Sequence, residues 1–123
     1  MTAPDAIRGV LSQYATFSGR AGRPEFWWWG LFVLLISAVT ALVDGVIFGF
    51  GRDASQPVSL VVTLGLILPS IAVGVRRLHD IDRSGWWCLL ALIPIIGTLI
   101  LIYFWIQPGS PGANPHGPAP GDP

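Results

Sequence analysis

The sequence predicts an all-α integral membrane protein with three transmembrane helices, preceded by an amphipathic helix at the membrane surface. Two observations support this prediction. Apolar residues make up 52% of the 123 residues and charged residues only 11%, and a soluble protein of this size has too little interior to bury so much apolar surface. The apolar residues also gather into three long runs, each close to the roughly 20 residues that a helix needs to cross a hydrocarbon core.

The first predicted element is a short helix over residues 4–17. Its apolar residues recur at helical spacing and would line one face of the helix. These residues are Ile7, Val10, Leu11, Tyr14 and Phe17. Thr2 is placed to cap the helix, and Asp5 follows three residues later. Because one face is apolar and the other polar, we expect this helix to lie flat in the membrane interface.

The three apolar runs, 26–43, 58–75 and 86–106, contain no charged residue. We expect each run to form a transmembrane helix, because the core helices of a soluble bundle would keep a polar face and these runs have none. Tryptophans open the first and third runs, as is typical of the membrane interface. One alternative stays open for the third run. In this alternative, Pro94 and Gly97 break the run into a re-entrant hairpin.

The whole chain, 1–123, is expected to form a single membrane domain that ends in a tail over 107–123. From Pro108 onward, six Pro and four Gly occur among 16 residues. Such a composition cannot continue a helix, because proline lacks the backbone N–H and glycine is conformationally free. We therefore expect an extended, poorly ordered tail.

The placement of arginine predicts the orientation in the membrane. The amino-terminal segment and the loop over 76–85 carry three Arg each, whereas the loop over 44–57 has one and the tail has none. Arginine near helix ends is retained on the cytoplasmic side. Three spans would therefore place the amino terminus in the cytoplasm and the carboxyl terminus outside, in a bacterial inner (plasma) membrane that the chain crosses several times. A hairpin in place of the third span would return the tail to the cytoplasm.

Composition also excludes several classes of function. Seven Arg balance seven acids and there is no Lys, so the chain lacks the basic stripe that nucleic-acid binding requires. The absence of Lys also excludes a P-loop lysine and a Schiff-base lysine. The single cysteine, Cys88, can form neither an internal disulfide nor a cysteine-based zinc site. We expect no cofactor.

Charged residues concentrate in two blocks, 17–27 and 76–87, which meet at the cytoplasmic face under the predicted topology. We call their charged members, together with one histidine, the polar cluster. The polar cluster consists of Arg20, Arg23, Glu25, Arg76, Arg77, His79, Asp80, Asp82 and Arg83. Charge of this density between two membrane spans, in a block too short to be a domain, makes it the candidate functional region.

Both blocks resemble motifs of a known family. The first block contains F-x-G-R-x-x-R-x-E-F-W and the second R-R-L-H-D-x-D-R-S-G-W-W, and the segments 92–97 and 109–120 are similar too. These motifs resemble the domain of unknown function 805 family, the YhaH type of small bacterial inner-membrane proteins, over nearly the whole chain. The resemblance implies a membrane location and a multi-helix fold, and it implies no activity. His116 departs from the aromatic residue expected in the tail, which weakens the expectation of aromatic docking there.

Three interpretations of the polar cluster compete. In the first, opposite charges pair in a structural lattice that ties the first helix to the second loop, because unpaired charges are costly near a low-dielectric boundary; Arg76 and Asp80 have the i, i+4 spacing that suits such a pair. In the second, the cluster binds anionic lipid headgroups or a partner protein. In the third, His79 and the neighbouring acids supply acid–base or metal chemistry, although no second histidine or recognised catalytic motif accompanies them.

We therefore predict a non-enzymatic scaffold or interaction component of the inner membrane, with no catalytic residue and no metal site. The alternative is a small transporter or channel subunit that acts as an oligomer, because three helices alone enclose little space. The expected partners are membrane lipids, including anionic headgroups, and either a second copy of the chain or another membrane protein.

Asp44 directly follows the first apolar run. At the centre of a bilayer, a charged carboxylate would cost roughly 2.5–3.5 kcal/mol. Its place at the end of the run predicts a position at the outer interface instead. There we expect it to be solvated or to pair with Arg52.

Overall fold

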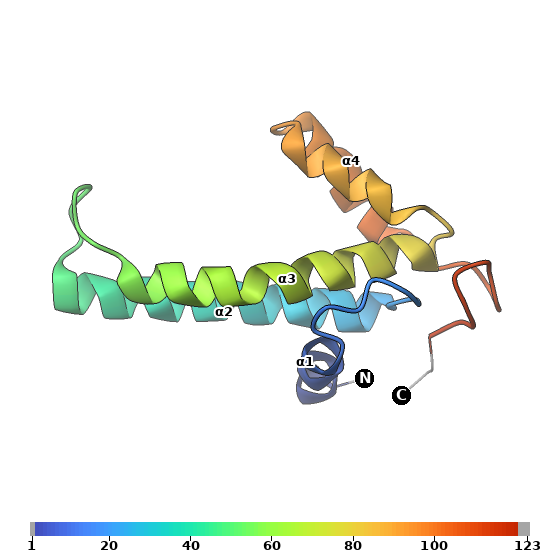
Figure 1. Cartoon of the computed structure of the whole chain (residues 1–123), viewed down its shortest axis with the longest axis horizontal. Helices are drawn as coiled ribbons and strands as arrows, with labels where there is room; N and C mark the ends of the chain where they lie inside the picture. The colour runs from blue at the N-terminus through green and yellow to red at the C-terminus, as the bar shows by residue number, and fades with distance from the viewer. Residues whose placement is uncertain (1, 121–123) are drawn as a thin grey trace.

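The computed structural model describes residues 2–120, which form helices in the order α1 (Ala3–Ser12), α2 (Arg23–Phe48), α3 (Pro57–Asp80), η1 (Gly85–Leu92) and α4 (Ile96–Ile106). Within these residues there is no strand, so the all-α prediction is confirmed. The two long helices, α2 and α3, lie side by side along the longest axis of the molecule (Figure 1). Near one end, α1 crosses this pair, and an arm made of η1 and α4 rises from the same end (Figure 1).

The two long helices contain the first two predicted spans. α2 has 26 residues and α3 has 24, which is enough to cross a membrane. Only 17% and 28% of their most apolar stretches are buried within the protein, whereas the core helices of a soluble protein are mostly buried. The predicted runs 26–43 and 58–75 lie inside these helices. Where the helices meet, the indole N–H of Trp29 donates a hydrogen bond to Ser70 Oγ at 3.0 Å.

The third predicted span, 86–106, is not one continuous helix. It is divided into the 3₁₀-helix η1 and the α-helix α4, and between them Ile95 has a φ of 66°. Pro94 has no backbone N–H to donate, and its ring clashes with a preceding helical turn. Gly97 lets α4 approach η1 closely, since a Cβ there would lie 1.7 Å from the carbonyl oxygen of Leu90. The expectation of one continuous helix over 86–106 is therefore wrong. The run forms a helical hairpin, which Pro94 and Gly97 make possible.

The hairpin returns the chain to the end of α3 from which it started (Figure 1). There the backbone N–H of Ser110 donates to the carbonyl oxygen of Asp80 at 2.6 Å. The described part of the tail, 107–120, therefore has defined partners instead of the poorly ordered conformation that its composition predicts; residues 121–123 lie outside the described residues. The tail and the amino-terminal segment lie at the same end of the α2–α3 pair, as a hairpin in place of the third span requires; the orientation of the termini in a membrane stays a prediction.

The amino-terminal helix α1 begins as predicted and ends earlier. Thr2 Oγ1 accepts a hydrogen bond from the backbone N–H of Asp5 at 3.4 Å, which caps the helix. The helix stops at Ser12 rather than at residue 17, and a turn follows. The polar N-terminal cap and the apolar periodicity are local features of the sequence, which is why the helix itself could be predicted.

The apolar face of α1 is divided between protein and surroundings. Ala6 and Val10 are fully buried, and Val10 belongs to a small core with Trp29 of α2 and Val73 of α3. Further along the segment, Leu11, Tyr14 and Phe17 are exposed. The predicted interfacial face is therefore partly a packing face, which fixes α1 across the start of α2 and the later turns of α3.

Candidate functional site

The polar cluster is built where the last turns of α3 meet the start of α2. α3 continues past its apolar stretch to Asp80, so that consecutive helical positions carry Arg76 and Arg77. Both arginine side chains are fully buried. Because neighbouring positions on a helix point about 100° apart, the two guanidinium groups reach different partners. Arg76 reaches α2, and Arg77 reaches the carboxyl end of α3 and the tail.

Arg76 forms a buried ion pair with Glu25. Its Nη1 lies 2.9 Å from Glu25 Oε1, and Glu25 is only 8% exposed. α1 covers this pair, since a Cβ on Gly9 would lie 3.5 Å from the same carboxylate oxygen. The carbonyl oxygen of Arg76 also accepts a hydrogen bond from the backbone N–H of Ala21 at 3.0 Å. This pair therefore connects α2, α3 and the loop that precedes α2.

Asp80 is the centre of a second set of ion pairs. Its Oδ1 lies 2.9 Å from Nη2 of Arg20, and its Oδ2 lies 2.6 Å from Nη1 of Arg77. The i, i+4 pair expected between Arg76 and Asp80 does not form, because Arg76 turns toward α2. The tail packs directly on this carboxylate, and a Cβ on Gly109 would lie 2.1 Å from Asp80 Oδ2. Only glycine fits at that position.

The arginines around Asp80 also bind the backbone of the carboxyl-terminal segment. Arg20 donates to the carbonyl oxygens of Ser110 at 2.6 Å and of Gly112 at 2.5 Å. Arg77 donates to the carbonyl oxygens of Trp105 at 3.1 Å and of Gln107. A guanidinium group has five N–H donors in a rigid fork, so each of these arginines can hold a carboxylate and several carbonyls at once.

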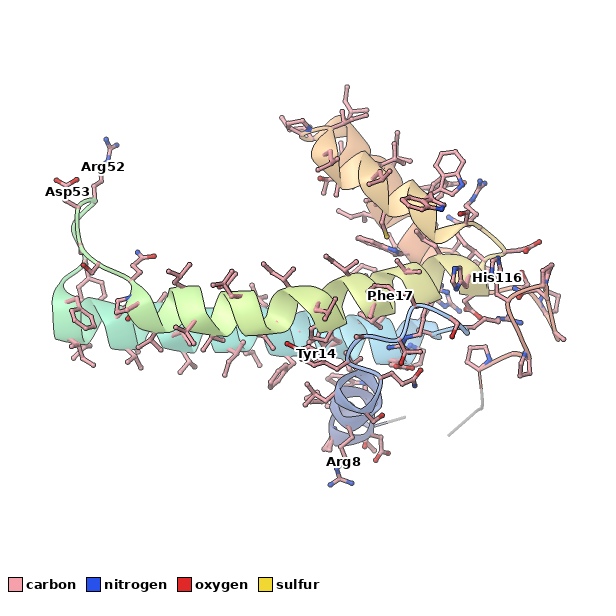
Figure 2. All side chains as sticks on the ribbon, in the orientation of Figure 1. Arg8, Tyr14, Phe17, Arg52, Asp53 and His116 are labelled. Atoms are coloured by element: carbon pink, nitrogen blue, oxygen red, sulfur yellow. The ribbon has the colours of Figure 1, made fainter. Side chains whose placement is uncertain are left out.

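His79 and His116 join the end of α3 to the tail. Their rings are stacked, with centroids 4.1 Å apart and planes 2° apart; His116 lies beside the carboxyl end of α3 (Figure 2). His79 Nδ1 lies 2.9 Å from the carbonyl oxygen of Gly19, and Asn114 Nδ2 donates to the carbonyl oxygen of His79 at 2.9 Å. The flat ring of His116 therefore docks the tail by stacking, although it departs from the aromatic residue that the family resemblance led us to expect.

Two electrostatic features accompany this stack. His79 lies beyond the apolar stretch 58–75, and burial is the main cause that lowers its pKa from the usual value; the bond to the Gly19 carbonyl acts in the opposite direction, and the neighbouring His116 lowers the pKa further. His116 Nε2 lies 3.8 Å from Asp82 Oδ1. Burial therefore favours the neutral form of His79.

The remaining members of the polar cluster lie at the surface. Arg23, Asp82 and Arg83 are exposed. In the described part of the chain, Arg23 and Arg83 form no ion pair, and the guanidinium carbon of Arg83 lies 4.4 Å from the ring centroid of Phe104. The structure thus brings six of the nine predicted residues into the packed interior of the cluster and leaves three outside it.

The sequence did not reveal that the tail completes this site. Its backbone carbonyl groups are the acceptors for Arg20 and Arg77, and any residue type can supply a carbonyl group. The only available signal was the tail segment 109–120, whose residues resemble the family motif. Across residues 2–120, no three His, Cys, Asp or Glu side chains gather in a way that could hold a metal ion. Both interior carboxylates already bind guanidinium groups, so the arrangement is suited to holding segments together.

The opposite end of the helix pair contains Asp44, which is only 1% exposed. Its two carboxylate oxygens accept hydrogen bonds from the backbone N–H groups of Val58 at 3.1 Å and Ser59 at 2.8 Å. We expected Asp44 to be solvated or to pair with Arg52. It does neither and instead caps the amino end of α3. Arg52 projects from the tip of the connecting loop, away from both helices (Figure 2).

The chain is similar in sequence to a described protein family and to two inner membrane proteins. The family described as "Protein of unknown function (DUF805)" matches residues 14–118. The chain is 45% identical over 113 residues to the inner membrane protein YhaH of Escherichia coli K12, covering 90% of this chain and 92% of that protein. It is 40% identical over 111 residues to the inner membrane protein YhaI of the same strain, covering 90% and 91% of the two chains. No solved structure matches.

Proposed function

We propose that this chain, which belongs to the DUF805 family of proteins of unknown function, is a non-enzymatic scaffold or interaction component of the bacterial inner membrane. The observation that carries the proposal is the division of the polar cluster. Three arginines are buried in ion pairs with Glu25 and Asp80, whereas Arg23 and Arg83 remain exposed at the same end. The buried part fixes the fold, and the exposed part offers charge to a partner.

The proposed membrane arrangement has two spans and one hairpin. α2 and α3 would cross the bilayer, while η1 and α4 would enter and leave by the same face. The 11 residues of α4 extend about 16 Å at 1.5 Å per residue, which is roughly half of a hydrocarbon core about 30 Å thick. The hairpin would therefore reach the middle of the bilayer. Because six of seven arginines belong to the segments at the polar-cluster end, that end and both termini would face the cytoplasm.

The exposed arginines would meet the headgroups of anionic lipids at this cytoplasmic face. Each basic residue near an anionic leaflet contributes about 1 kcal/mol of attraction. A guanidinium group can bind phosphate through two parallel hydrogen bonds. Arg8 projects from α1 away from the long helices (Figure 2) and would add a third basic group. The buried pairs contribute less to this attraction, because two carboxylates offset two of their three positive charges and the groups are shielded from the surface.

Binding of phosphatidylglycerol to the detergent-solubilised protein, measured by native mass spectrometry, tests the proposal. The double variant Arg23→Gln/Arg83→Gln should weaken binding by about fivefold for each arginine, which corresponds to about 1 kcal/mol. It should lower the thermal unfolding temperature only slightly, through loss of the contact between Arg83 and Phe104. Arg52→Gln is the matched control, because it removes the same charge from the opposite end. If each of the three arginine substitutions weakens phosphatidylglycerol binding equally, the lipid responds to the net charge of the protein and not to a defined surface.

The buried pairs give the complementary test. Glu25→Gln and Asp80→Asn should each lower the unfolding temperature in detergent whether or not phosphatidylglycerol is present, because each leaves a buried guanidinium group without its counter-charge. If both variants instead bind phosphatidylglycerol more tightly and unfold at the original temperature, the whole cluster is a lipid-binding surface and the structural role assigned to its interior is wrong.

A further inference from the structure

A cavity of about 490 Å³ lies between α3 and η1. Its apolar walls include Phe17 from the loop after α1, Ile71 from α3 and Trp86 from η1. Its polar groups are those of His79 and Ser84. The volume falls within the range of about 300–1,000 Å³ that is typical of small-molecule sites.

A second cavity, of about 200 Å³, shares Ile71 and Cys88 with the first and extends toward α4. Trp105 lines this smaller cavity. The indole N–H of Trp105 is buried and has no hydrogen-bond acceptor among residues 2–120. Such a donor costs about 1–3 kcal/mol, but it is fully shielded, so a ligand in this cavity would meet the apolar part of the indole ring.

The polar groups at these cavities match a neutral ligand. Because the Gly19 carbonyl can only accept, the bond at 2.9 Å requires a proton on His79 Nδ1, and in the neutral ring Nε2 is then an acceptor. Ser84 Oγ accepts from the backbone N–H of Trp86 at 3.3 Å, which leaves its hydroxyl hydrogen free to donate. The site thus offers an acceptor at His79 and a donor at Ser84. No arginine or carboxylate lines either cavity.

The larger cavity is polar at one end and apolar at the other. Ile71 and His79 are eight residues apart on α3, which corresponds to about 12 Å along the helix. The polar side chains lie next to the polar cluster, at the membrane face, and the apolar wall lies deeper along the span. A molecule with a polar head and an apolar chain fits this gradient with its head at the membrane face.

We propose that the two cavities form a binding site for one molecule of a neutral glycerolipid of the diacylglycerol type. Its free hydroxyl group would donate to His79 Nε2, and an ester carbonyl would accept from the hydroxyl of Ser84. One acyl chain would follow the apolar wall past Ile71. This site goes beyond the proposed attraction to anionic headgroups, since it uses different residues and a ligand without charge.

A phospholipid fits the same cavities less well. Its phosphate would lie among side chains that carry no positive charge, and a charge buried without a counter-charge is strongly disfavoured. The buried guanidinium groups of Arg20 and Arg77 already bind Asp80 and backbone carbonyls, and that of Arg76 binds Glu25. A neutral head with hydroxyl and ester groups is therefore favoured over an anionic one.

The test uses the full chain in phosphatidylcholine nanodiscs with a diacylglycerol that carries a photoreactive group in one acyl chain. Labelled residues are mapped by mass spectrometry after irradiation. We expect labelling concentrated on η1 and on α3 near Ile71, and loss of this labelling when unlabelled diacylglycerol is added in excess. Ile71→Trp, which fills the cavities, should reduce it at least tenfold. Leu60→Trp is the matched control, because Leu60 lies on an exposed part of the same helix.

Ser84→Ala provides a variant that leaves the volume of the site almost unchanged. It should weaken competition by diacylglycerol by about fivefold, in line with the loss of one hydrogen bond, and it should lower the unfolding temperature only slightly, because Ser84 Oγ also caps η1. Labelling spread along all exposed helix faces and insensitive to Ile71→Trp would overturn the proposal, as would equal competition by phosphatidylglycerol. Loss of labelling in Arg23→Gln/Arg83→Gln would also overturn it. These outcomes leave the phosphatidylglycerol test of the proposed function unaffected.

Discussion

The two ends of the α2–α3 pair each bury a carboxylate, and they stabilise it in different ways. At one end, Asp44 accepts hydrogen bonds from two backbone N–H groups at the start of α3, which are only 14 and 15 residues away in the sequence. At the other end, Asp80 lies between two guanidinium groups, and one of them, from Arg20, is 60 residues distant. The first arrangement needs only a helical hairpin, whereas the second needs nearly the whole chain.

This difference has a mechanical consequence. The cap at Asp44 joins two helices and uses the partial positive charge at the amino end of α3. The cluster at Asp80 holds the loop before α2, the end of α3 and the tail in one network. Disturbing the first should loosen one connection, while disturbing the second should release several segments together. The two ends should therefore differ in location, in stability and in their response to pH.

The largest expected effect is the placement of the two ends on opposite sides of the membrane. A phosphatase reporter inserted after Asp53 should be active, because that loop would lie outside, whereas reporters after Ser84 and after Pro123 should both be inactive. Three continuous spans predict instead an active reporter after Pro123. Activity at the carboxyl terminus combined with inactivity after Ser84 would therefore exclude the half-depth hairpin.

The next effect is on stability at the polar-cluster end. Asp80→Asn removes the counter-charge of two arginines, of which Arg77 is fully buried, and breaking such a buried pair costs about 3–5 kcal/mol. The unfolding temperature in detergent should fall by more than about 10 °C. Asp82→Asn is the matched control, because Asp82 is exposed and two residues away; it should change the temperature little. Equal falls in the unfolding temperature for Asp80→Asn and Asp82→Asn would mean that Asp80 stabilises the fold no more than an exposed carboxylate does.

A smaller effect is expected at the opposite end. Asp44→Ala removes a helix cap, which typically costs about 0.5–2 kcal/mol, and should lower the unfolding temperature less than Asp80→Asn does. Asp44→Asn should retain part of the cap, because its side-chain oxygen still accepts one hydrogen bond. A loss at Asp44 as large as the loss at Asp80 would remove the distinction between a local cap and a distributed network.

The same distinction explains which features the sequence could predict. The periodicity of α1, its cap at Thr2 and the two apolar helices are local patterns, and the structure contains them. The polar cluster was also visible as two charged blocks. Its pairing was not, because whether Arg76 or Arg77 faces Asp80 depends on how α3 is rotated against α2 and the tail. The i, i+4 rule describes an isolated helix and does not include those neighbours.

The hairpin and the tail show two further limits. Hydropathy treats the run 86–106 as one span because it counts apolar residues and ignores backbone geometry, although Pro94 and Gly97 carried the opposite signal. For the tail, composition reports correctly that no helix can form. It says nothing of backbone carbonyls, which are present at every residue and which Arg20 uses at Ser110 and Gly112.

The smallest expected effect is a pH response that only the polar-cluster end should show. The folded-state pKa of His79 is lowered, chiefly by burial, so its folded form holds a proton less well than the unfolded chain, whose histidines titrate near pH 6.5. Stability is therefore fully present above about pH 6.5. It declines as the pH falls through that value and levels off below the folded-state pKa. The His116 ring, stacked against His79 with its centroid 4.1 Å away, lowers the pKa of His79 further.

The tail should accordingly be released from the end of α3 more easily at pH 5.5 than at pH 7.5. Limited proteolysis of the tail at the two pH values measures this release, and we expect cleavage several times faster at the lower pH. His116→Phe keeps a flat ring on His79 and removes the smaller contribution of His116 to the lowered pKa, so it should reduce the acceleration in part and leave the rate at pH 7.5 unchanged. The same acceleration in His116→Phe as in the original chain would show that the stacked histidines do not control the docking of the tail. Cleavage of the loop at Arg52 serves as the internal reference, because no histidine lies in that loop.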